Sequence, residues 1–176
     1  VNISASMLFA GISGTAISDT ASLGAVMIPA MKKEGYDSDF SCAITAASST
    51  VGPIIPPSLP MIIAATLSGL SVGKLFLAGA IPGLLLGLGL MMVAYFVAKK
   101  KHYPKHSKSS LLQILKSFTN TFWALLMTVI ILFGIVGGIF TPTEASVVAV
   151  LYALFIGLFV YKKLNLKNIS VVVLDS

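Results

Sequence analysis

Two polar segments that carry glycine or proline interrupt strongly apolar sequence in the first third of this 176-residue chain. One is SGTAISDT, residues 13–20, and the other is SSTVGPIIPPSLP, residues 48–60. Inside a lipid bilayer, backbone that leaves a helix cannot hydrogen-bond to lipid, so such breaks persist only where they line a cavity in the protein. The two segments therefore predict paired breaks in membrane helices around an ion or substrate site.

The composition requires a membrane environment. Hydrophobic residues make up 56% of the chain and charged residues only 10%, with a mean hydropathy of +0.96. A soluble domain of this length could not bury so much apolar surface. A helix that crosses a bilayer needs about 20 apolar residues, and residues 76–98, 118–139 and 145–161 are the ordinary candidates for such spans. We expect an all-α integral membrane protein.

The distribution of lysine indicates which ends of the helices face the cytoplasm. The chain has twelve lysines and no arginine, and all the lysines except Lys74 lie in residues 32–33, 99–116 and 162–167. Because positive residues accumulate in cytoplasmic loops, we expect these clusters on the cytoplasmic side and Lys74 on the other side. The basic stretch KKKHYPKHSK is too short a loop to favour a nucleic-acid interface, and contact with lipid headgroups explains it better.

This topology gives the two breaks different forms. The first lies near the middle of residues 1–31 and leaves two arms of about 11 residues, each about 17 Å long and so reaching about half of a 30 Å hydrocarbon core. We expect a re-entrant hairpin that enters and leaves the membrane from the cytoplasm. The hairpin is expected to span residues 1–35. Residues 36–67 then form a discontinuous transmembrane helix with its break at residues 51–58.

The polar segment between the hairpin and the next helix contains signals for helix ends. Lys32 and Lys33 lie where the C-terminus of a helix favours cations. Gly35 can adopt the left-handed conformation that ends a helix, and Asp37 or Asp39 can N-cap the helix that follows.

The later segments follow from their apolar length and capping patterns. Residues 99–117 are expected to be a basic cytoplasmic loop, in which SLLQ at 110–113 starts either a helix along the membrane interface or an extension of the next span. Residues 137–144 are expected to form an external turn with a helix cap, and a third break is the alternative. Residues 162–176 are interpreted as the cytoplasmic start of a truncated segment, because the sequence reads as a fragment.

The residues of the two breaks suit a hard cation. Serine and threonine hydroxyls, with carbonyls that proline leaves unpaired, form an all-oxygen set, and Gly14 and Gly52 let the backbone approach an ion closely. The N-termini of the half-helices could present amides to an anion. The hydroxyl-bearing residues are Ser13, Thr15, Ser18, Thr20, Ser48, Ser49 and Thr50, and the prolines are Pro53, Pro56, Pro57 and Pro60.

Asp19 and Cys42 stand apart from these sets. Asp19 is the only acid well inside an apolar stretch, where carboxylates are functional by default, although it could equally cap the second arm of the hairpin. Cys42 is the only cysteine, which excludes an internal disulfide and a cysteine-built metal site, and we expect it to be a packing residue.

An intramembrane serine protease is a remote alternative. The segment GISG at residues 11–14 matches the GxSG pattern around the serine of rhomboid proteases. Nucleophilic use of Ser13 would need a base within hydrogen-bond reach, and the only histidines, His102 and His106, lie in the basic loop. We therefore expect that the chain is not an enzyme.

Three stretches of the chain together resemble one transporter family. They are residues 13–65 (SGTAISDTASLGAVMIPAMKKEGYDSDFSCAITAASSTVGPIIPPSLPMIIAA), 73–88 (GKLFLAGAIPGLLLGL) and 138–146 (GIFTPTEAS). From about residue 10 to 161 the sequence is similar to the large membrane subunit of tripartite ATP-independent periplasmic (TRAP) transporters. The resemblance implies an ion-transporter-superfamily-type fold of two inverted repeats, each with a re-entrant hairpin and a discontinuous helix. This chain would hold the first repeat and the start of the second.

The resemblance also implies a function. Such a protein is a multi-pass subunit of a secondary transporter in a bacterial inner (cytoplasmic) membrane, with no cofactor and with sodium ions as coupling ions. It takes up a dicarboxylate, sialic acid or sugar acid delivered by a periplasmic solute-binding protein, by an elevator-type motion against a scaffold that a small membrane subunit completes. The alternative is a divalent-anion sodium symporter of related fold without a binding protein.

Carried over by position, the resemblance implies a first sodium site at the hairpin tip and the unwound link. Its ligands would be Ser13, Gly14, Thr15, Ser49, Thr50, Gly52, Ile55 and Pro57, the last three through their carbonyls. The residues that could touch substrate or shape the tip are Asp19, Ser48, Pro53, Pro56 and Ser58. Nothing in the sequence resembles the hairpin and broken helix of a second repeat, so we expect that this polypeptide alone does not transport.

Overall fold

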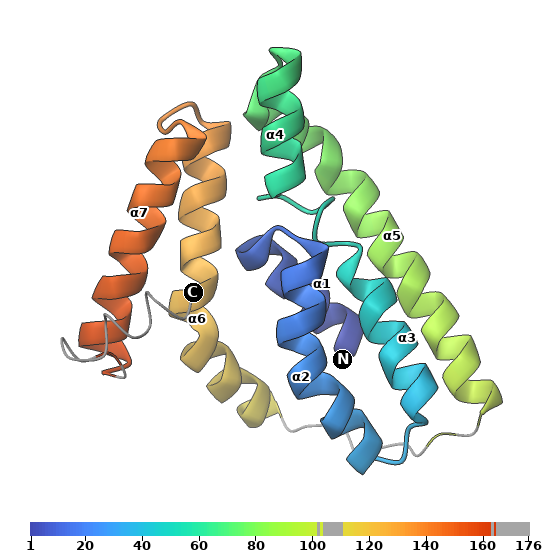
Figure 1. Ribbon diagram of the computed structural model, residues 1–176. Coiled ribbons are helices and arrows are strands. Elements are labelled where there is room, and N and C mark those ends of the chain that lie inside the picture. The colour runs from blue at the N-terminus through green and yellow to red at the C-terminus, as the bar shows by residue number, and fades with distance from the viewer. Residues whose placement is uncertain (102, 104–110, 163, 165–176) are drawn as a thin grey trace. The chain divides into compact units, whose positions relative to one another are not determined.

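The structure is a computed structural model that describes residues 1–101, 103, 111–162 and 164, without the side chains of residues 111–116 and 120. Every regular element in these ranges is a helix, so the expected all-helical class is confirmed for the described part of the chain. The helices form two compact units, residues 1–109 and residues 110–176 (Figure 1). We call them unit 1 and unit 2 and describe each by itself.

Unit 1 is built from a helical hairpin, an interrupted helix and one long helix (Figure 1). The hairpin consists of α1 (Asn2–Ser13) and α2 (Ala16–Lys33), and the interrupted helix consists of α3 (Ser38–Ser49) and α4 (Leu59–Ser68). The long helix α5 (Val72–Lys100) packs against α1, α3 and α4. That the hairpin is re-entrant in a membrane stays a prediction.

The first interruption is shorter than its polar sequence. α1 ends at Gly14, which has the left-handed φ of 63° and donates its amide to the carbonyl of Ala10. The hydroxyl of Thr15 accepts from the amide of Ser18 at 3.3 Å and thereby N-caps α2. Asp19 therefore lies in the first turn of a helix, and the second arm has 18 residues rather than the expected eleven.

The second interruption is a link between α3 and α4, residues 50–58, which contains three prolines that cannot donate a backbone hydrogen bond. Its first half forms tight turns, because the amides of Ile54 and Ile55 donate to the carbonyl of Val51 at 3.0 and 2.9 Å. Its end is held by Ser58, which N-caps α4 and donates its hydroxyl to the carbonyl of Pro53 at 2.6 Å. The link therefore folds back on itself.

Polar contacts join the loop between α2 and α3 to the end of α5. Gly35 has a positive φ of 86°, as expected for a helix end. Asp37 occupies the N-cap position of α3 but makes no cap, because its carboxylate accepts from Lys101 Nζ at 2.6 Å and from the Tyr103 hydroxyl at 2.7 Å. Asp37 therefore takes the expected N-cap position, but its side chain pairs with Lys101 and Tyr103 and does not cap the helix.

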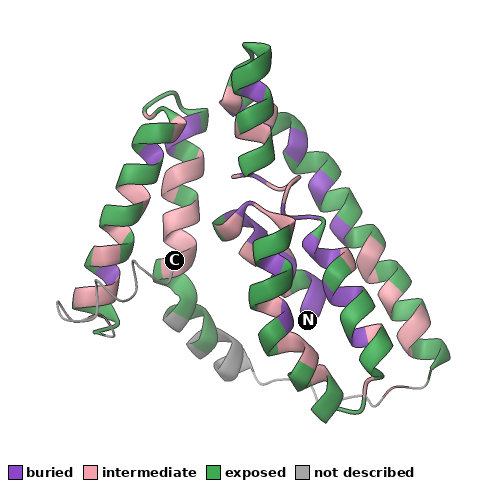
Figure 2. Ribbon diagram, in the orientation of Figure 1, coloured by how far each residue is buried: buried purple, intermediate pink, exposed green. Residues whose placement is uncertain are grey.

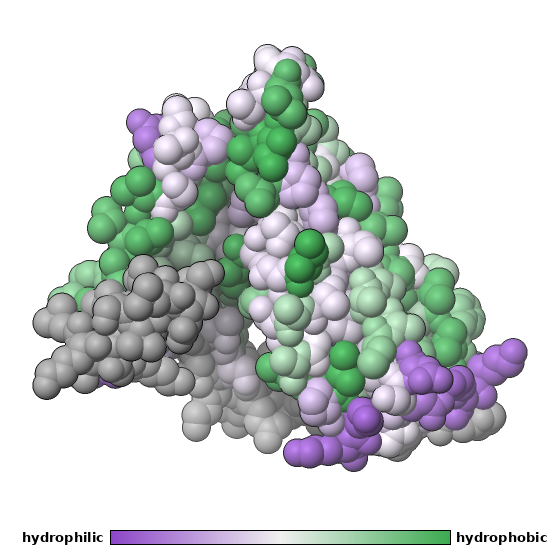
Figure 3. Space-filling model, in the orientation of Figure 1, coloured by the Kyte–Doolittle hydropathy of each residue, from purple (hydrophilic) through white to green (hydrophobic). Residues whose placement is uncertain are grey.

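These contacts place two lysine clusters at one end of unit 1. The hydrogen bond from Lys101, followed by that from Tyr103, holds the pKa of the Asp37 carboxyl below its ordinary value. Residues 32–33 and 99–101 are exposed around the contact and contribute to the hydrophilic end of unit 1 in Figure 3. Their expected position on a common side is confirmed within unit 1, and the assignment of that side to the cytoplasm stays a prediction.

The interior of unit 1 is polar where α1 meets α3. The side-chain amide of Asn2 donates to the hydroxyl of Thr45 at 2.8 Å, and the hydroxyls of Ser6 and Ser48 hydrogen-bond at 2.7 Å, with all four residues buried. Buried residues recur along both helices in Figure 2. Since lipid is as apolar as leucine, helices in a membrane associate through close packing and such interhelical bonds. We call these four residues the polar ladder.

The helical period of α3 corrects the expectation for Cys42. Ser41, Ile44, Thr45 and Ser48 are buried at the spacing of one helix face, which contacts α1 and α2. Cys42 falls on another face and is exposed, so its interpretation as a packing residue is wrong.

Unit 2 contains a second helical hairpin. It consists of α6 (Leu111–Val136) and α7 (Pro142–Phe155), and α7 continues into a π-helical turn, η1 (Ile156–Val160). Because α6 is continuous, the helix expected within residues 99–117 and the span expected at 118–139 are one helix. Most of the basic loop and of residues 162–176 lies outside the described residues.

The connection between α6 and α7 is the expected turn with a helix cap. Gly138 has a φ of 70° in this turn. Thr141 and Glu144 then form a capping box, in which the amide of Glu144 donates to Thr141 Oγ1 at 3.3 Å and the amide of Thr141 donates to Glu144 Oε2 at 2.8 Å. The turn and the cap are confirmed and the alternative of a third break is wrong, while the external position of the turn stays a prediction.

Two helices in the described part of the chain are long and apolar enough to cross a membrane. They are α5, and α7 together with η1, each with a mean hydropathy of 2.1 over its most apolar stretch. The core helix of a soluble protein would be mostly buried, whereas both of these are mostly exposed, with only 22% and 11% of those stretches buried. Figure 3 shows the same hydrophobic exposure over α4. The structure agrees with the membrane protein expected from composition.

We expect the polar ladder to stabilise unit 1. Ser48→Ala leaves the buried Ser6 hydroxyl without its partner, which costs about 1–3 kcal/mol, and Ser6→Ala should cost a similar amount. The double variant should cost less than the sum, because both changes remove one shared bond. Thermal unfolding of the detergent-solubilised protein measures these differences, and Ser4→Ala, on the exposed side of α1, is the control. Additive losses would contradict direct coupling of the two hydroxyls.

Candidate functional site

The tip of the hairpin, residues 13–15, lies against the link. The amide of Leu59, at the start of α4, donates to the carbonyl of Gly14 at 3.2 Å. A Cβ at Gly14 would lie 2.8 Å from the carbonyl oxygen of Pro57, closer than real Cβ contacts. Gly14 also has the left-handed φ that residues with side chains rarely adopt. The two breaks, far apart in sequence, therefore meet in unit 1.

Asp19 extends this contact between the hairpin and the link. The hydroxyl of Ser13 donates to one carboxylate oxygen, Oδ1, and Asp19 is completely buried. The other oxygen, Oδ2, has no hydrogen-bond partner among the described residues and faces Gly52, where a Cβ would lie 2.5 Å from it. Asp19 does not cap the second arm, because Thr15 does so. One buried carboxylate oxygen is thus left open between hairpin and link.

The link supplies further oxygen acceptors. Within the part of the chain that the structure describes, no hydrogen bond ends on the carbonyl oxygen of Gly52, Ile55 or Pro57. Proline explains this, since residues 56 and 57 have no amide and the helical pattern cannot continue through them. These three carbonyls are the ones expected as cation ligands. Gly52 and Pro57 also make the closest contacts with the hairpin, at Asp19 and Gly14.

The hydroxyls expected as ligands differ in what they already bind. The hydroxyl of Ser13, at the tip, donates to Asp19, and the hydroxyl of Thr15 caps α2. Ser49 is completely buried and donates to a carbonyl of its own helix at 2.8 Å, which leaves its oxygen able to accept or to coordinate. Thr50 is exposed and donates to a carbonyl of α3 at 2.7 Å.

The residues expected to touch substrate or shape the tip have structural contacts. The hydroxyl of Ser48 is part of the polar ladder. Ser58 and Pro53 hold the two ends of the link together, and Pro56 is joined to Pro57 by a cis peptide bond.

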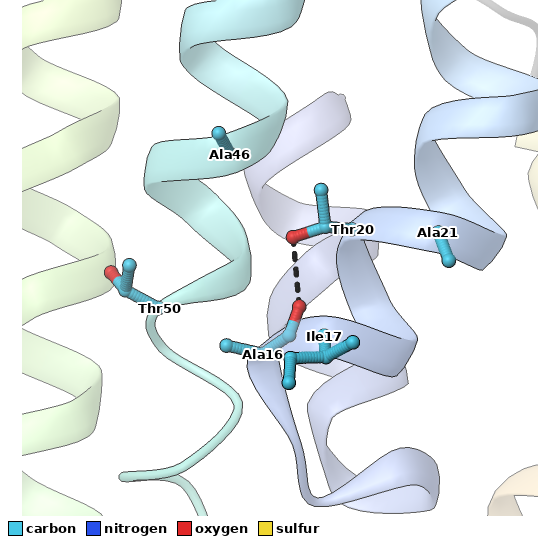
Figure 4. A pocket seen from close by; sticks show the side chains of 6 residues that line it. All are labelled: Ala16, Ile17, Thr20, Ala21, Ala46 and Thr50. Carbon is cyan, nitrogen blue, oxygen red and sulfur yellow. Dashed lines mark hydrogen bonds between the residues drawn. The ribbon is translucent and has the colours of Figure 1, made fainter.

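A groove of about 510 Å³ lies between the start of α2 and the end of α3 (Figure 4). The hydroxyl of Thr20 donates to the carbonyl of Ala16 at 2.8 Å, as the dashed line in Figure 4 shows. Four of the six lining residues are alanine or isoleucine, so the groove is mainly apolar, and of the sodium ligands that the resemblance implies only Thr50 lines it. Its lining residues are Ala16, Ile17, Thr20, Ala21, Ala46 and Thr50.

The arrangement suits a hard cation rather than catalysis. No three His, Cys, Asp or Glu side chains come together among the described residues, so a cation here would rely on Asp19 with hydroxyl and carbonyl oxygens. The hydroxyl of Ser13 is bonded to a carboxylate. The candidate bases for a serine nucleophile, His102 and His106, lie outside the described residues.

Comparison with known proteins finds similarity along the whole chain. Residues 1–176 match the family described as "Tripartite ATP-independent periplasmic transporter, DctM component". The chain is 48% identical to a sialic acid TRAP transporter permease of Haemophilus influenzae, over 96% of this chain and 27% of that protein. It is 45% identical to a C4-dicarboxylate TRAP transporter large permease of Pseudomonas aeruginosa, over 98% of this chain and 40% of that protein.

A third relative is an isethionate TRAP transporter permease of Oleidesulfovibrio alaskensis, which is 43% identical over 90% of this chain and 25% of its own length. The chain therefore spans about a quarter to two fifths of the length of these relatives. The activity of a whole permease cannot be assigned to these residues alone.

Replacing Gly52 with alanine should push the link away from the hairpin, because the new Cβ would collide with Asp19 Oδ2. We expect a loss of stability of about 1–3 kcal/mol, measured as a lower thermal midpoint and faster proteolysis within the link. Gly24→Ala on α2 is the control, since its Cβ meets only ordinary contacts at 3.6 and 3.8 Å and alanine favours a helix. Equal midpoints for Gly52→Ala and the unmodified protein would contradict the close approach of Asp19.

Proposed function

Because the chain belongs to the family of tripartite ATP-independent periplasmic transporters, as its DctM component, we propose that it carries the first half of the cation and substrate site of a sodium-coupled permease. The members of this family are transporters and not enzymes, so the serine protease alternative is set aside. The divalent-anion symporter alternative is set aside because the family that residues 1–176 match is that of the tripartite periplasmic transporters.

The observation that carries the proposal is the open oxygen of Asp19 where the tip meets the link. The one ion pair between described residues joins Lys101 to Asp37, so no cationic side chain compensates Asp19. A buried carboxylate without a partner of opposite charge is costly inside a membrane. A bound cation would remove this cost, and the unpaired carbonyls of Gly52, Ile55 and Pro57 would complete its shell.

We propose that this cation is sodium and that Asp19 binds it directly. In this assignment Ser13 and Ser49 contribute hydroxyl oxygens. Like Ser49, Thr50 donates its hydroxyl proton to a carbonyl of α3 and keeps an oxygen that can coordinate. The full proposed set is Ser13, Gly14, Thr15, Asp19, Ser49, Thr50, Gly52, Ile55 and Pro57.

The two half-helix N-termini support an anionic substrate beside the cation. α2 begins directly after the tip, and α4 begins at Leu59, whose amide contacts the tip. Both helices therefore direct the positive ends of their dipoles toward the same region, where a carboxylate is favoured. We propose a carboxylate solute as substrate, in keeping with the sialic acid and C4-dicarboxylate that the relatives' names state.

The division into two units supports an elevator-type mechanism. Unit 1 contains both breaks and all the proposed ligands, whereas unit 2 contains none of them. A compact unit that carries the whole half-site can move as a rigid body against a scaffold. We propose an ion-transporter-superfamily-type fold in a bacterial inner membrane, with a second inverted repeat, a small membrane subunit and a periplasmic solute-binding protein completing the transporter.

Uptake by the intact permease should require sodium. We expect proteoliposomes with the small subunit and the solute-loaded binding protein to take up the carboxylate under an inward sodium gradient, but not under a potassium or proton gradient. Asp19→Asn removes the charge that balances the cation and should lower uptake at least about tenfold.

Asp39→Asn is the matched control, because this carboxylate is exposed on α3, and its uptake should equal that of the unmodified transporter. Uptake driven by a proton gradient without sodium would contradict the assignment of sodium. Sodium-driven uptake that persists undiminished in Asp19→Asn would contradict the role of Asp19.

A further inference from the structure

The link rests on one face of α5. Gly79, Gly83 and Gly87 recur every four residues along this helix and are buried. They cover about 12 Å of helix length on a single face. The helix presents a surface without side chains to the link and to α1.

The three glycines contact different kinds of atoms. The three atoms nearest to a Cβ at Gly87 would all belong to the flexible side chain of Met7 on α1. A Cβ at Gly83 would lie 2.7 Å from a side-chain carbon of Ile55. A Cβ at Gly79 would lie 2.8 Å from the backbone carbonyl oxygen of Ile54, besides meeting the end of the Met61 side chain. At Gly83 the added Cβ would also lie 3.4 Å from the backbone nitrogen of Ile55, so an added methyl group would press most closely on the backbone of the link at Gly79.

The backbone at Ile54 cannot avoid the added methyl group by a change of rotamer, as a side chain can. The amides of Ile54 and Ile55 both donate to the carbonyl of Val51, which holds this peptide in its turn. A methyl group at position 79 would therefore displace the link as a body. The residues displaced include Ile55, whose carbonyl is one of the proposed ligands.

The position of the link has few other determinants. Residues 56 and 57 are prolines and have no amides to anchor them. On one side the link contacts the hairpin at Gly14 and Asp19, and on the other it contacts α5. The distance between the link carbonyls and Asp19 therefore depends on how closely the link packs against α5.

We propose that Gly79 is a positioning residue for the cation site, which sets the affinity for the cation by fixing the Ile54–Ile55 peptide relative to the hairpin. It does not touch the cation itself. The inference rests on the proposed function, because it takes sodium as the cation. It adds a residue on a third helix, outside both breaks, to the determinants of that site.

The test uses the intact permease with its small subunit and binding protein. Gly79→Ala should raise the sodium concentration for half-maximal uptake about tenfold, as the loss of outer-shell support does for other metal sites. The maximal rate at saturating sodium and the half-saturating concentration of the loaded binding protein should change much less. A second readout is the sodium-dependent rise in thermal midpoint of the purified protein, with choline at equal ionic strength as reference. It should need the same tenfold higher sodium.

Two glycines of the same helix provide matched controls. Gly89→Ala adds a Cβ that meets nothing within 4 Å, and Gly87→Ala presses on the flexible side chain of Met7. Both should keep the sodium dependence of the unmodified transporter. An equal shift in Gly87→Ala and Gly79→Ala would overturn the inference, because it would show a general disturbance of α5.

A double variant covers the case in which Gly79→Ala does not fold. Met61→Ala combined with Gly79→Ala removes the side-chain collision and keeps the one with the Ile54 carbonyl. It should retain the raised sodium requirement, and a return to the original value would overturn the inference. If the unmodified transporter is sodium-dependent and neither variant shifts that dependence, only the role of Gly79 fails. If the unmodified transporter ignores sodium, the proposed function fails first.

Discussion

Backbone groups that leave a helix inside a bilayer need partners within the protein, and in unit 1 each break provides partners for the other. Each unsatisfied group would cost several kcal/mol in lipid. The amide of Leu59 bonds to the carbonyl of Gly14, and the Asp19 carboxylate of the hairpin lies against Gly52 in the link without bonding to it. What remains open after this mutual satisfaction is a buried carboxylate oxygen and a few carbonyls, including that of Ile55. The candidate cation site is therefore the set of oxygens that neither break can satisfy.

The rest of unit 1 holds the two breaks in contact. The polar ladder fastens α1 to α3, so the arm that leads into the tip and the arm that leads into the link are joined by buried hydrogen bonds. At the lysine-rich end of unit 1, Asp37 bonds to Lys101 and so connects the loop between α2 and α3 to the end of α5. Gly79 and Gly83 of α5 lie close against the link. Because apolar burial does little to drive the association of helices in lipid, these specific contacts hold the helices of unit 1 together.

Local sequence signals predicted the helices well and the functions of individual polar side chains less well. Proline and glycine located both breaks, and the capping pattern at Thr141 located the turn in unit 2 correctly. Asp37 was expected to cap α3 but pairs with Lys101, which is distant in sequence, and Cys42 was expected to be buried but faces outward. A residue's partner and the face it occupies depend on which helices pack together. No local pattern states that packing. The amide of Leu59 carries no side-chain signal at all.

The sequence by itself determined that this is an apolar, helical chain with two breaks, with lysines at the helix ends and with membership of a transporter family. The family follows from sequence similarity along the chain, whereas the other properties follow from composition, periodicity and local backbone chemistry, which act over a few residues. Only the tertiary structure decided that the breaks meet, that Asp19 keeps one oxygen open between them, and that Gly79 supports the link from behind. Such facts depend on distances of a few ångströms between segments far apart in the chain, and packing alone sets those distances.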